Sequence, residues 1–177
     1  MTTLLLVRHG ETDWNADGRL QGQTDRPLSE YGRRQAQQLA GELADERFEA
    51  IFASDLSRAR DTAEIVGKRL GLTVAFDPDL REKDWGNWEG LTAVERDRVE
   101  FVGESTEAHS ERMLRALRRI ADRHPGETRV LVVTHGGSMR RVQVAAMGMA
   151  LPVVENCGSW LCVCENGTFQ PVGLGVP

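Results

Sequence analysis

Two histidines stand where a short apolar run ends, a place where chemically active side chains are often found. His9 follows Arg8 and the apolar run of residues 3–7, and His135 follows the apolar run of residues 130–134. A single histidine in such a place is usually a hydrogen-bonded core residue. Two of them need a further explanation, because neighbouring parallel strands would bring both rings into one crevice at the carboxyl edge of a sheet.

A phosphate site would explain this concentration of basic groups. The segment SRARDTA places Arg58 at the expected start of a helix, after another apolar run at residues 50–54. Two guanidiniums and two imidazoles in one pocket would repel one another unless an anion belonged there. Guanidinium groups match tetrahedral oxyanions with paired donors. The residue types and their positions therefore predict a site for a phosphate group.

Short apolar runs alternate with helical patterns along the whole chain. The continuous apolar character of residues 3–7 and 130–134 is typical of strands buried on both faces. Helical spacing predicts one helix that begins at Ser29 and a second helix that ends at Gly71. A third predicted helix ends before Pro125. The expected strands are residues 3–7, 50–54, 73–76, 130–134, 159–164 and 168–172, and the expected helices are 29–44, 58–70, 105–124 and the stretch from His135 through Met147.

Strands that alternate with helices predict an α/β fold, a three-layer α/β/α sandwich around a mostly parallel sheet. The length of 177 residues suits one domain, and we expect residues 1–177 to form it, because no repeat, linker or low-complexity tract interrupts them. Such sheets place their sites beyond the carboxyl ends of the strands. His9 and His135 stand at two such ends.

Composition argues against several other classes of protein. A net charge of −5 is unfavourable for binding nucleic acid or anionic membranes. Neither a signal peptide pattern nor an apolar stretch long enough to span a membrane is present, so we expect a cytoplasmic protein. Cys157, Cys162 and Cys164 are expected to be structural core residues rather than metal or redox groups. The oligomeric state is not readable from the sequence.

Six segments of the chain resemble the histidine phosphatase superfamily, also called the phosphoglycerate mutase-like family. They occur in the family's order and cover nearly the whole chain. The segments are RHGETDWN at 8–15, RLQGQTDRPLSEYGRRQA at 19–36, SDLSRARDTA at 54–63, LREKDWGNWEG at 80–90, GES at 103–105 and VTHGG at 133–137. The resemblance also implies the sandwich fold that the order of elements predicts.

The resemblance implies a role for each residue that matches the motifs. His9 would be the nucleophile that takes the phosphoryl group, and Glu82 would be the proton donor. Arg8, Arg58 and His135 would bind the equatorial oxygens of that group. The residues expected to contact or line the phosphate pocket are Asn15, Gln21, Gly22 and Gly136.

The implied chemistry is consistent with these residue types. A neutral imidazole is a competent nucleophile at pH 7, and nearby guanidiniums disfavour its protonation. The other ring nitrogen of His9 needs an acceptor, which the sequence does not identify. We expect no cofactor and no metal, because arginines can supply the positive charge that phosphoryl transfer requires.

The family contains phosphatases and mutases, and the segment after Glu82 favours a phosphatase. A mutase usually needs an enclosing basic insertion there, but only 12 residues, Leu91 to Val102, separate WEG from GES. Water should reach the intermediate, so we expect hydrolysis of small phosphorylated metabolites. A mutase, a protein phosphohistidine phosphatase and a non-catalytic phosphate-binding module remain as alternatives. A metallohydrolase is disfavoured because no His-x-His or HExxH spacing occurs.

Several other polar residues are expected to have structural roles. Glu11 and Glu89 should make local contacts, and His109 and His124 on the long helix should be solvated. The adjacent Arg140 and Arg141 should form structural ion pairs. The sequence does not decide whether Trp14, Trp85 or Trp88 lines the pocket.

Overall fold

A mixed six-stranded sheet forms the centre of the computed structural model, which describes residues 1–149 and 151–174. The strand order is β3-β2-β4-β1-β5-β6, and the first four strands are parallel to one another. β5 pairs antiparallel with both β1 and β6. The strands are β1 (Thr2–Arg8), β2 (Ala50–Ala53), β3 (Val74–Phe76), β4 (Thr128–Thr134), β5 (Ser159–Glu165) and β6 (Thr168–Leu174).

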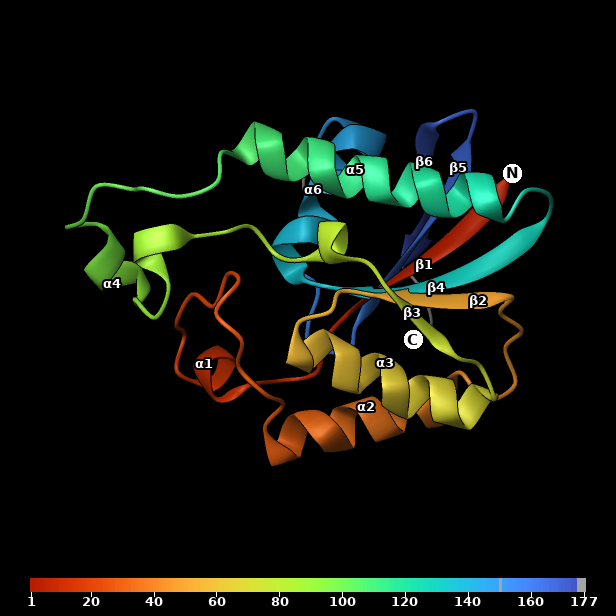
Figure 1. The fold of residues 1–177 in the computed structure, drawn as a ribbon, viewed down its shortest axis with the longest axis horizontal. Coiled ribbons are helices and arrows are strands. Elements are labelled where there is room, and N and C mark those ends of the chain that lie inside the picture. Colours follow the sequence, from red (N-terminus) through yellow and green to blue (C-terminus); the bar gives the residue numbers. More distant parts are fainter. Residues whose placement is uncertain (150, 175–177) are drawn as a thin grey trace.

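Helices cover both faces of this sheet (Figure 1). Leu4 and Leu6 of β1 belong to the core cluster that includes side chains of α5 and α6. Leu5 and Val7 belong to the cluster on the other face, with α2 and α3. The alternation is that of a strand buried on both sides, and it confirms the predicted three-layer sandwich. The four covering helices are α2 (Glu30–Glu42), α3 (Ser57–Leu70), α5 (Thr106–Arg123) and α6 (Gly136–Met147).

The neighbouring positions of β1 and β4 matter most for the site. Their parallel register pairs Arg8 with Thr134, so both strands end at the same level. The residues that follow them, His9 and His135, therefore emerge side by side. Cys162 and Cys164 are buried on β5, as their alternation predicts, and join the core cluster under α5 and α6.

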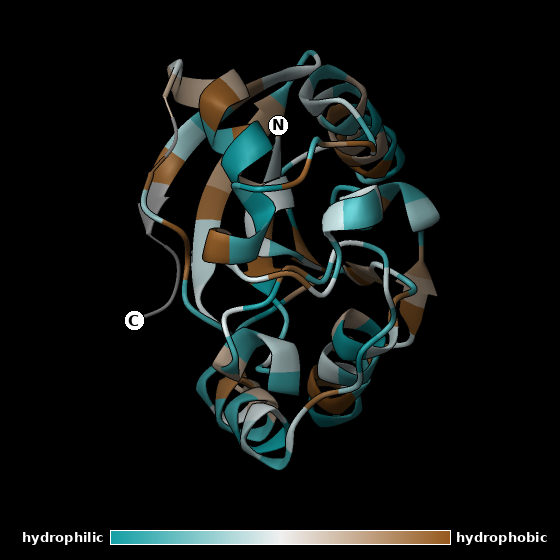
Figure 2. Cartoon of the chain, turned by 90° about the vertical axis from the view of Figure 1, so that its left-hand side faces the viewer, coloured by the Kyte–Doolittle hydropathy of each residue, from teal (hydrophilic) through white to brown (hydrophobic). Residues whose placement is uncertain are grey.

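Short helical turns lie beyond the carboxyl ends of the parallel strands, and they were not predicted from the sequence. A capping box of Thr12 with Asn15 stabilises the first turn, and one of Thr92 with Glu95 stabilises the last. Figure 1 shows α1 and α4 at this end, and Figure 2 faces it, with connecting segments mostly teal and white. The turns are α1 (Asp13–Ala16), η1 (Pro78–Leu80), η2 (Gly86–Trp88) and α4 (Ala93–Arg96).

The helix boundaries follow the capping residues that the sequence contains. Ser29 accepts a hydrogen bond from the Gly32 N–H at 3.0 Å and begins α2. Gly71 ends α3 in the left-handed region, at φ +70°. In the described part of the chain, no helix is both long enough and apolar enough to cross a membrane.

Two glycines with open surroundings should respond in opposite directions to alanine. A Cβ at Gly71 or Gly41 would meet no atom within 4 Å, so only backbone preferences act. Gly71→Ala should lower the free energy of unfolding by about 1–2 kcal/mol, because its φ is left-handed. Gly41→Ala, inside α2, should raise it by about 0.5–1 kcal/mol. Urea denaturation measures both changes, and changes of the same sign would contradict this account.

Candidate active site

The two histidines predicted to share a crevice lie against each other. The ring centroids of His9 and His135 are 5.1 Å apart, and the planes meet at 61°. Their side chains are 3% and 1% exposed. The His9 N–H donates to the Thr134 carbonyl at 3.0 Å, which extends the β1–β4 pairing into the site. Sheet register therefore fixes the distance between the two rings.

All nine residues predicted to form the site line one cavity of about 140 Å³. They come from the end of β1 and the residue after it, from α1 and the loop after it, from the start of α3, from the segment after η1, and from the junction between β4 and α6. Arg19 and Trp85 also line the cavity, although the sequence did not assign them to it. The nine predicted residues are Arg8, His9, Asn15, Gln21, Gly22, Arg58, Glu82, His135 and Gly136.

His9 is held as a neutral ring with one free nitrogen. Its Nδ1 lies 2.7 Å from the Gly10 carbonyl oxygen, which can only accept, so Nδ1 carries the proton and donates it to that oxygen. Burial, followed by the guanidiniums of Arg58 and Arg8, holds the pKa of His9 well below its ordinary value. The Nε2 lone pair is therefore available at neutral pH. The Gly10 carbonyl is the acceptor that the sequence did not identify.

Three nitrogen atoms of residues that line this cavity are buried without a partner among the described residues. They are Nε of Arg8, Nε of Arg58 and Nδ1 of His135. His135 Nε2 lies 2.9 Å from the Ser54 hydroxyl, which accepts from the Leu56 amide at 3.4 Å and can donate its own proton to Nε2. In that tautomer Nδ1 carries the ring proton and is a donor. A buried polar group without a partner costs about 1–3 kcal/mol. An oxyanion bound in the cavity would offer acceptors to these nitrogens.

Both arginines donate hydrogen bonds to backbone carbonyls through terminal guanidinium nitrogens. Arg8 donates to the Val154 carbonyl at 2.8 Å. Arg58 donates to the carbonyls of Gly22 at 2.6 Å and Thr24 at 3.0 Å. Burial lowers the pKa of Arg58 to about 10, so its guanidinium is still charged at neutral pH. These contacts aim two positive groups at the cavity without neutralising either one.

Glu89 holds the loop that carries Gln21 and Gly22. It accepts hydrogen bonds from the amides of Gln23 and Thr24, both at 2.8 Å, and from the Trp85 amide at 3.1 Å. Gly22 has φ +56°, and a Cβ there would lie 2.0 Å from the Glu89 carboxylate. Glu89 therefore makes local structural contacts, as predicted.

Glu82 lies where the N-terminus of α6 meets the cavity. Its Oε2 accepts from the Gly137 N–H at 2.9 Å, and its Oε1 accepts from the Lys83 N–H at 2.8 Å. A Cβ at position 137 would lie 2.4 Å from Oε1, so the carboxylate needs a glycine there. Both hydrogen bonds orient the carboxyl group toward the lining of the cavity.

The expectation that His109 is solvated is wrong. The side chain is 2% exposed, its Nε2 lies 2.9 Å from the Ser138 hydroxyl, and it lies 3.7 Å from Glu82 Oε1. Burial lowers the pKa of His109. Its spacing of four residues from Met113, which is fully buried on the same helix face, is the signal that could have revealed its burial.

The aromatic residues near the site divide between lining and packing. Trp85 lines the cavity, and Trp88 stacks on it with ring centroids 6.1 Å apart. Trp14 packs against the Gly90 backbone and lies under the guanidinium of Arg26.

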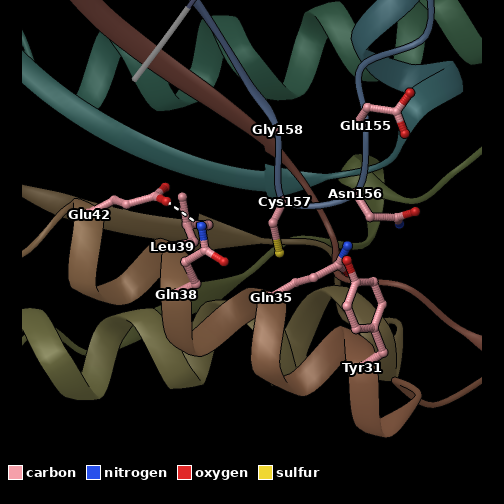
Figure 3. Close-up of a pocket in the computed structure, with 9 residues that line it drawn as sticks. All are labelled: Tyr31, Gln35, Gln38, Leu39, Glu42, Glu155, Asn156, Cys157 and Gly158. Carbon is pink, nitrogen blue, oxygen red and sulfur yellow. Dashed lines mark hydrogen bonds between the residues drawn. The ribbon is translucent and has the colours of Figure 1, made fainter. Parts of the chain in front are cut away.

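A larger cavity of about 270 Å³ lies away from this site, between α2 and the segment before β5 (Figure 3). Its lining includes Glu42, Glu155 and Cys157, and no lysine or arginine of the described part of the chain contributes to it. Burial raises the pKa of Cys157 to about 12, which keeps the thiol protonated. The lining thus has no charge that would attract a phosphate. Within the described ranges, no cluster of three or more His, Cys, Asp or Glu side chains is arranged to hold a metal ion.

Acid should destabilise the protein because three neutral histidines are buried. The pKa values of His9, His109 and His135 are lowered, so below about pH 6.5 the unfolded chain binds protons that the folded chain does not. As the pH is lowered, the free energy of unfolding should decrease by up to about 1.4 kcal/mol per pH unit for each histidine. His135→Asn should make this slope shallower in urea denaturation between about pH 7 and pH 5.5. Equal slopes in the two proteins would contradict the assignment.

Comparisons with known proteins match nearly the whole chain. The family model of the histidine phosphatase superfamily (branch 1) matches residues 4–172. Phosphoglycerate mutase-like protein 4 of Arabidopsis thaliana is 38% identical over 169 residues, which cover 85% of this chain and 73% of that protein. A metal-independent phosphoserine phosphatase of Arabidopsis thaliana is 39% identical over 161 residues, which cover 80% of this chain and 67% of that protein.

A solved structure agrees with the fold over almost the full length. A mycobacterial glucosyl-3-phosphoglycerate phosphatase, in complex with VO3, superposes with a TM-score of 0.87 at 30% identity, covering 99% of this chain and 98% of that one. Relatives named as phosphatases and as mutases share this fold. The chain is therefore an enzyme of the phosphatase or mutase type, and it belongs to branch 1 of the histidine phosphatase superfamily.

Proposed function

We propose that this enzyme hydrolyses small-molecule phosphate monoesters through a phosphohistidine on His9. The observation that carries the proposal is the pairing of a free imidazole nitrogen with unpartnered buried donors in one cavity. Nε2 of His9 is unprotonated because Nδ1 donates to the Gly10 carbonyl. Arg8, Arg58 and His135, each of which has a buried nitrogen without a partner among the described residues, line the same space. Charge on the equatorial oxygens of a transferring phosphoryl group would be stabilised there.

In the first step, Nε2 of His9 attacks phosphorus and the bond from phosphorus to the ester oxygen breaks. Glu82, in its protonated form, transfers its proton to the departing oxygen, so the alcohol leaves neutral. The guanidiniums of Arg8 and Arg58 offset the negative charge of the phosphoryl oxygens. The Asn15 side chain contributes to the same cavity, and its Oδ1 is already bonded to the Thr12 amide at 3.2 Å. Its NH₂ group is the part suited to an oxyanion.

In the second step, water attacks phosphorus and the bond to Nε2 breaks. The Glu82 carboxylate takes a proton from the attacking water, which restores the acid for the next turnover. Inorganic phosphate leaves, and His9 returns to its neutral tautomer. The charge that a divalent metal supplies in other phosphoryl-transfer enzymes is supplied here by the two arginines.

The segment after Glu82 supports hydrolysis over transfer to a second substrate. None of the residues from Leu91 to Val102 lines the catalytic cavity. Instead, the segment packs beside the loop after α1, where the Leu20 N–H donates to the Leu91 carbonyl at 3.0 Å. Water would reach a phosphohistidine without displacing an enclosing segment. The relatives named above as phosphatases act, by their names, on phosphoserine and glucosyl-3-phosphoglycerate, which are small phosphate monoesters.

Labelling should locate the covalent intermediate on His9. Brief reaction with a phosphate monoester, stopped with alkali, should leave phosphate on His9 that acid releases, and mass spectrometry of the digested chain would locate it. His9→Ala should lose both label and turnover while keeping its folded far-ultraviolet spectrum. His124→Gln is the matched control, because this histidine is bonded to Glu49 outside the cavity. Label on an aspartate or serine would end the proposal.

The role of Glu82 should depend on the leaving group. Glu82→Gln should slow phosphorylation of His9 by an alkyl phosphate by about 10²–10⁴-fold, because the alkoxide needs a proton. With p-nitrophenyl phosphate the loss should be much smaller, because the phenolate is already a stable leaving group. Arg58→Ala should slow both substrates alike, since it removes charge stabilisation. Pre-steady-state rates measure these effects. Equal losses for both esters in Glu82→Gln would show that Glu82 is not the acid.

A further inference from the structure

A second cavity of about 230 Å³ adjoins the catalytic one. The two cavities share Glu82, Trp85 and Gly137 as wall residues. The catalytic cavity lies on the His9 side of this wall. The second cavity extends from it toward α5 and α6, where the further wall includes Arg140 and Arg141.

The second cavity is lined by three cations that lack carboxylate partners. Lys83, Arg140 and Arg141 line it, and no ion pair within 4.0 Å involves any of them among the described residues. The expectation that Arg140 and Arg141 form structural ion pairs is therefore wrong. Within residues 1–149 and 151–174, Glu82 is the one carboxylate in the lining, and backbone amides already donate to both of its oxygens.

Lys83 is held in the cavity although burial is unfavourable for its charge. Its side chain is 8% exposed, and burial lowers its pKa. Nζ donates to the Thr106 hydroxyl at 3.2 Å, and it lies 4.4 Å from the Trp85 ring centroid and 4.7 Å from that of Phe101. An ammonium group has three N–H donors, so one hydroxyl acceptor leaves the others available for a ligand.

Arg140 lines this cavity and has a guanidinium nitrogen that is not paired among the described residues. Its Nε is buried and has no hydrogen-bond partner in the described part of the chain. Burying an unpaired donor is unfavourable, and a guanidinium is suited to paired contacts with a carboxylate or phosphate. The same two features, unpaired guanidinium nitrogen and absence of a neutralising ion pair, characterise the catalytic cavity.

We propose that this second cavity, the anion subsite, binds a carboxylate or phosphate group on the alcohol part of the substrate. The inference rests on the proposed function, in which Glu82 protonates the departing ester oxygen. That oxygen must then lie at the wall that both cavities share. The alcohol continues from this oxygen, away from His9, and the anion subsite is the cavity on that side. The preferred substrates are therefore phosphate monoesters whose alcohol carries a second negative charge.

Three esters with the same alkyl chain test this preference. Propyl phosphate has no second charge, the phosphate ester of hydroxypropanoate carries a carboxylate, and propanediol bisphosphate carries a second phosphate. We expect kcat/KM to be about ten- to a hundredfold higher for at least one of the anionic esters than for propyl phosphate. The better of the two identifies which anion the subsite takes. Equal kcat/KM for all three would overturn the proposal.

Charge-removing variants assign the preference to the subsite. Arg141→Gln, and separately Arg140→Gln, should reduce the ratio of kcat/KM for the anionic ester to that for propyl phosphate by about tenfold or more. Arg115→Gln is the matched control, because Arg115 is an exposed arginine of α5 with only a 3.7 Å contact to Asp79, and its ratio should not change. Thermal unfolding checks that each variant is folded. A variant that slows all esters equally would contradict a role in binding the second anion.

Binding of phosphonates separates failure of the subsite from failure of the proposed reaction. Butylphosphonate and phosphonobutyrate differ only in the carboxylate and cannot be hydrolysed. Calorimetric titration should show tighter binding of phosphonobutyrate, and Arg141→Gln should remove that advantage. If the His9 label is absent but the advantage is present, the subsite stands without the reaction. If the label is present but neither the phosphonates nor the esters show a preference, the reaction stands without the subsite.

Discussion

The structure depends on an excess of buried positive charge at the carboxyl end of β1 and β4. Arg8 and Arg58 line a cavity in which Glu82 is the one carboxylate among the described residues. Because the protein does not neutralise the guanidiniums with ion pairs, it anchors them with backbone carbonyls, which hold their positions and preserve their charge. The same charge, added to burial, keeps the adjacent imidazoles neutral. In the proposed reaction, binding of an oxyanion and reactivity of His9 would thus have one electrostatic origin.

Two carboxylates hold the surrounding loops by accepting hydrogen bonds from backbone amides. Glu89 accepts hydrogen bonds from the amides of Gln23, Thr24 and Trp85, so it joins the loop after α1 to the segment after Glu82. Glu82 bonds two amides yet still faces the cavity. These two carboxylates lie seven positions apart in one loop-rich segment, and of the two only Glu82 lines the cavity in the described part of the chain.

The central architecture could be predicted from the sequence because its signals are local. The apolar runs before His9 and His135 gave the two central strands, and Ser29 and Gly71 gave helix boundaries. The short turns could not be predicted in this way, because three or four residues show no periodicity and depend on contacts between distant loops. The surroundings of Arg140 and Arg141 also depend on tertiary packing. Adjacent arginines look alike in sequence whether carboxylates or a cavity lie beside them.

The motif residues could be placed in one cavity, but their hydrogen-bond partners could not be predicted. The Gly10 carbonyl that orients His9 belongs to the next residue, yet only the backbone conformation turns it toward the ring. The unpartnered nitrogens of Arg8, Arg58 and His135 have a consequence for the reaction's end as well as its beginning. In the proposed reaction, inorganic phosphate is complementary to the same donors as the substrate. Product and substrate then compete for one cavity, and net turnover depends on the phosphate concentration of the surroundings.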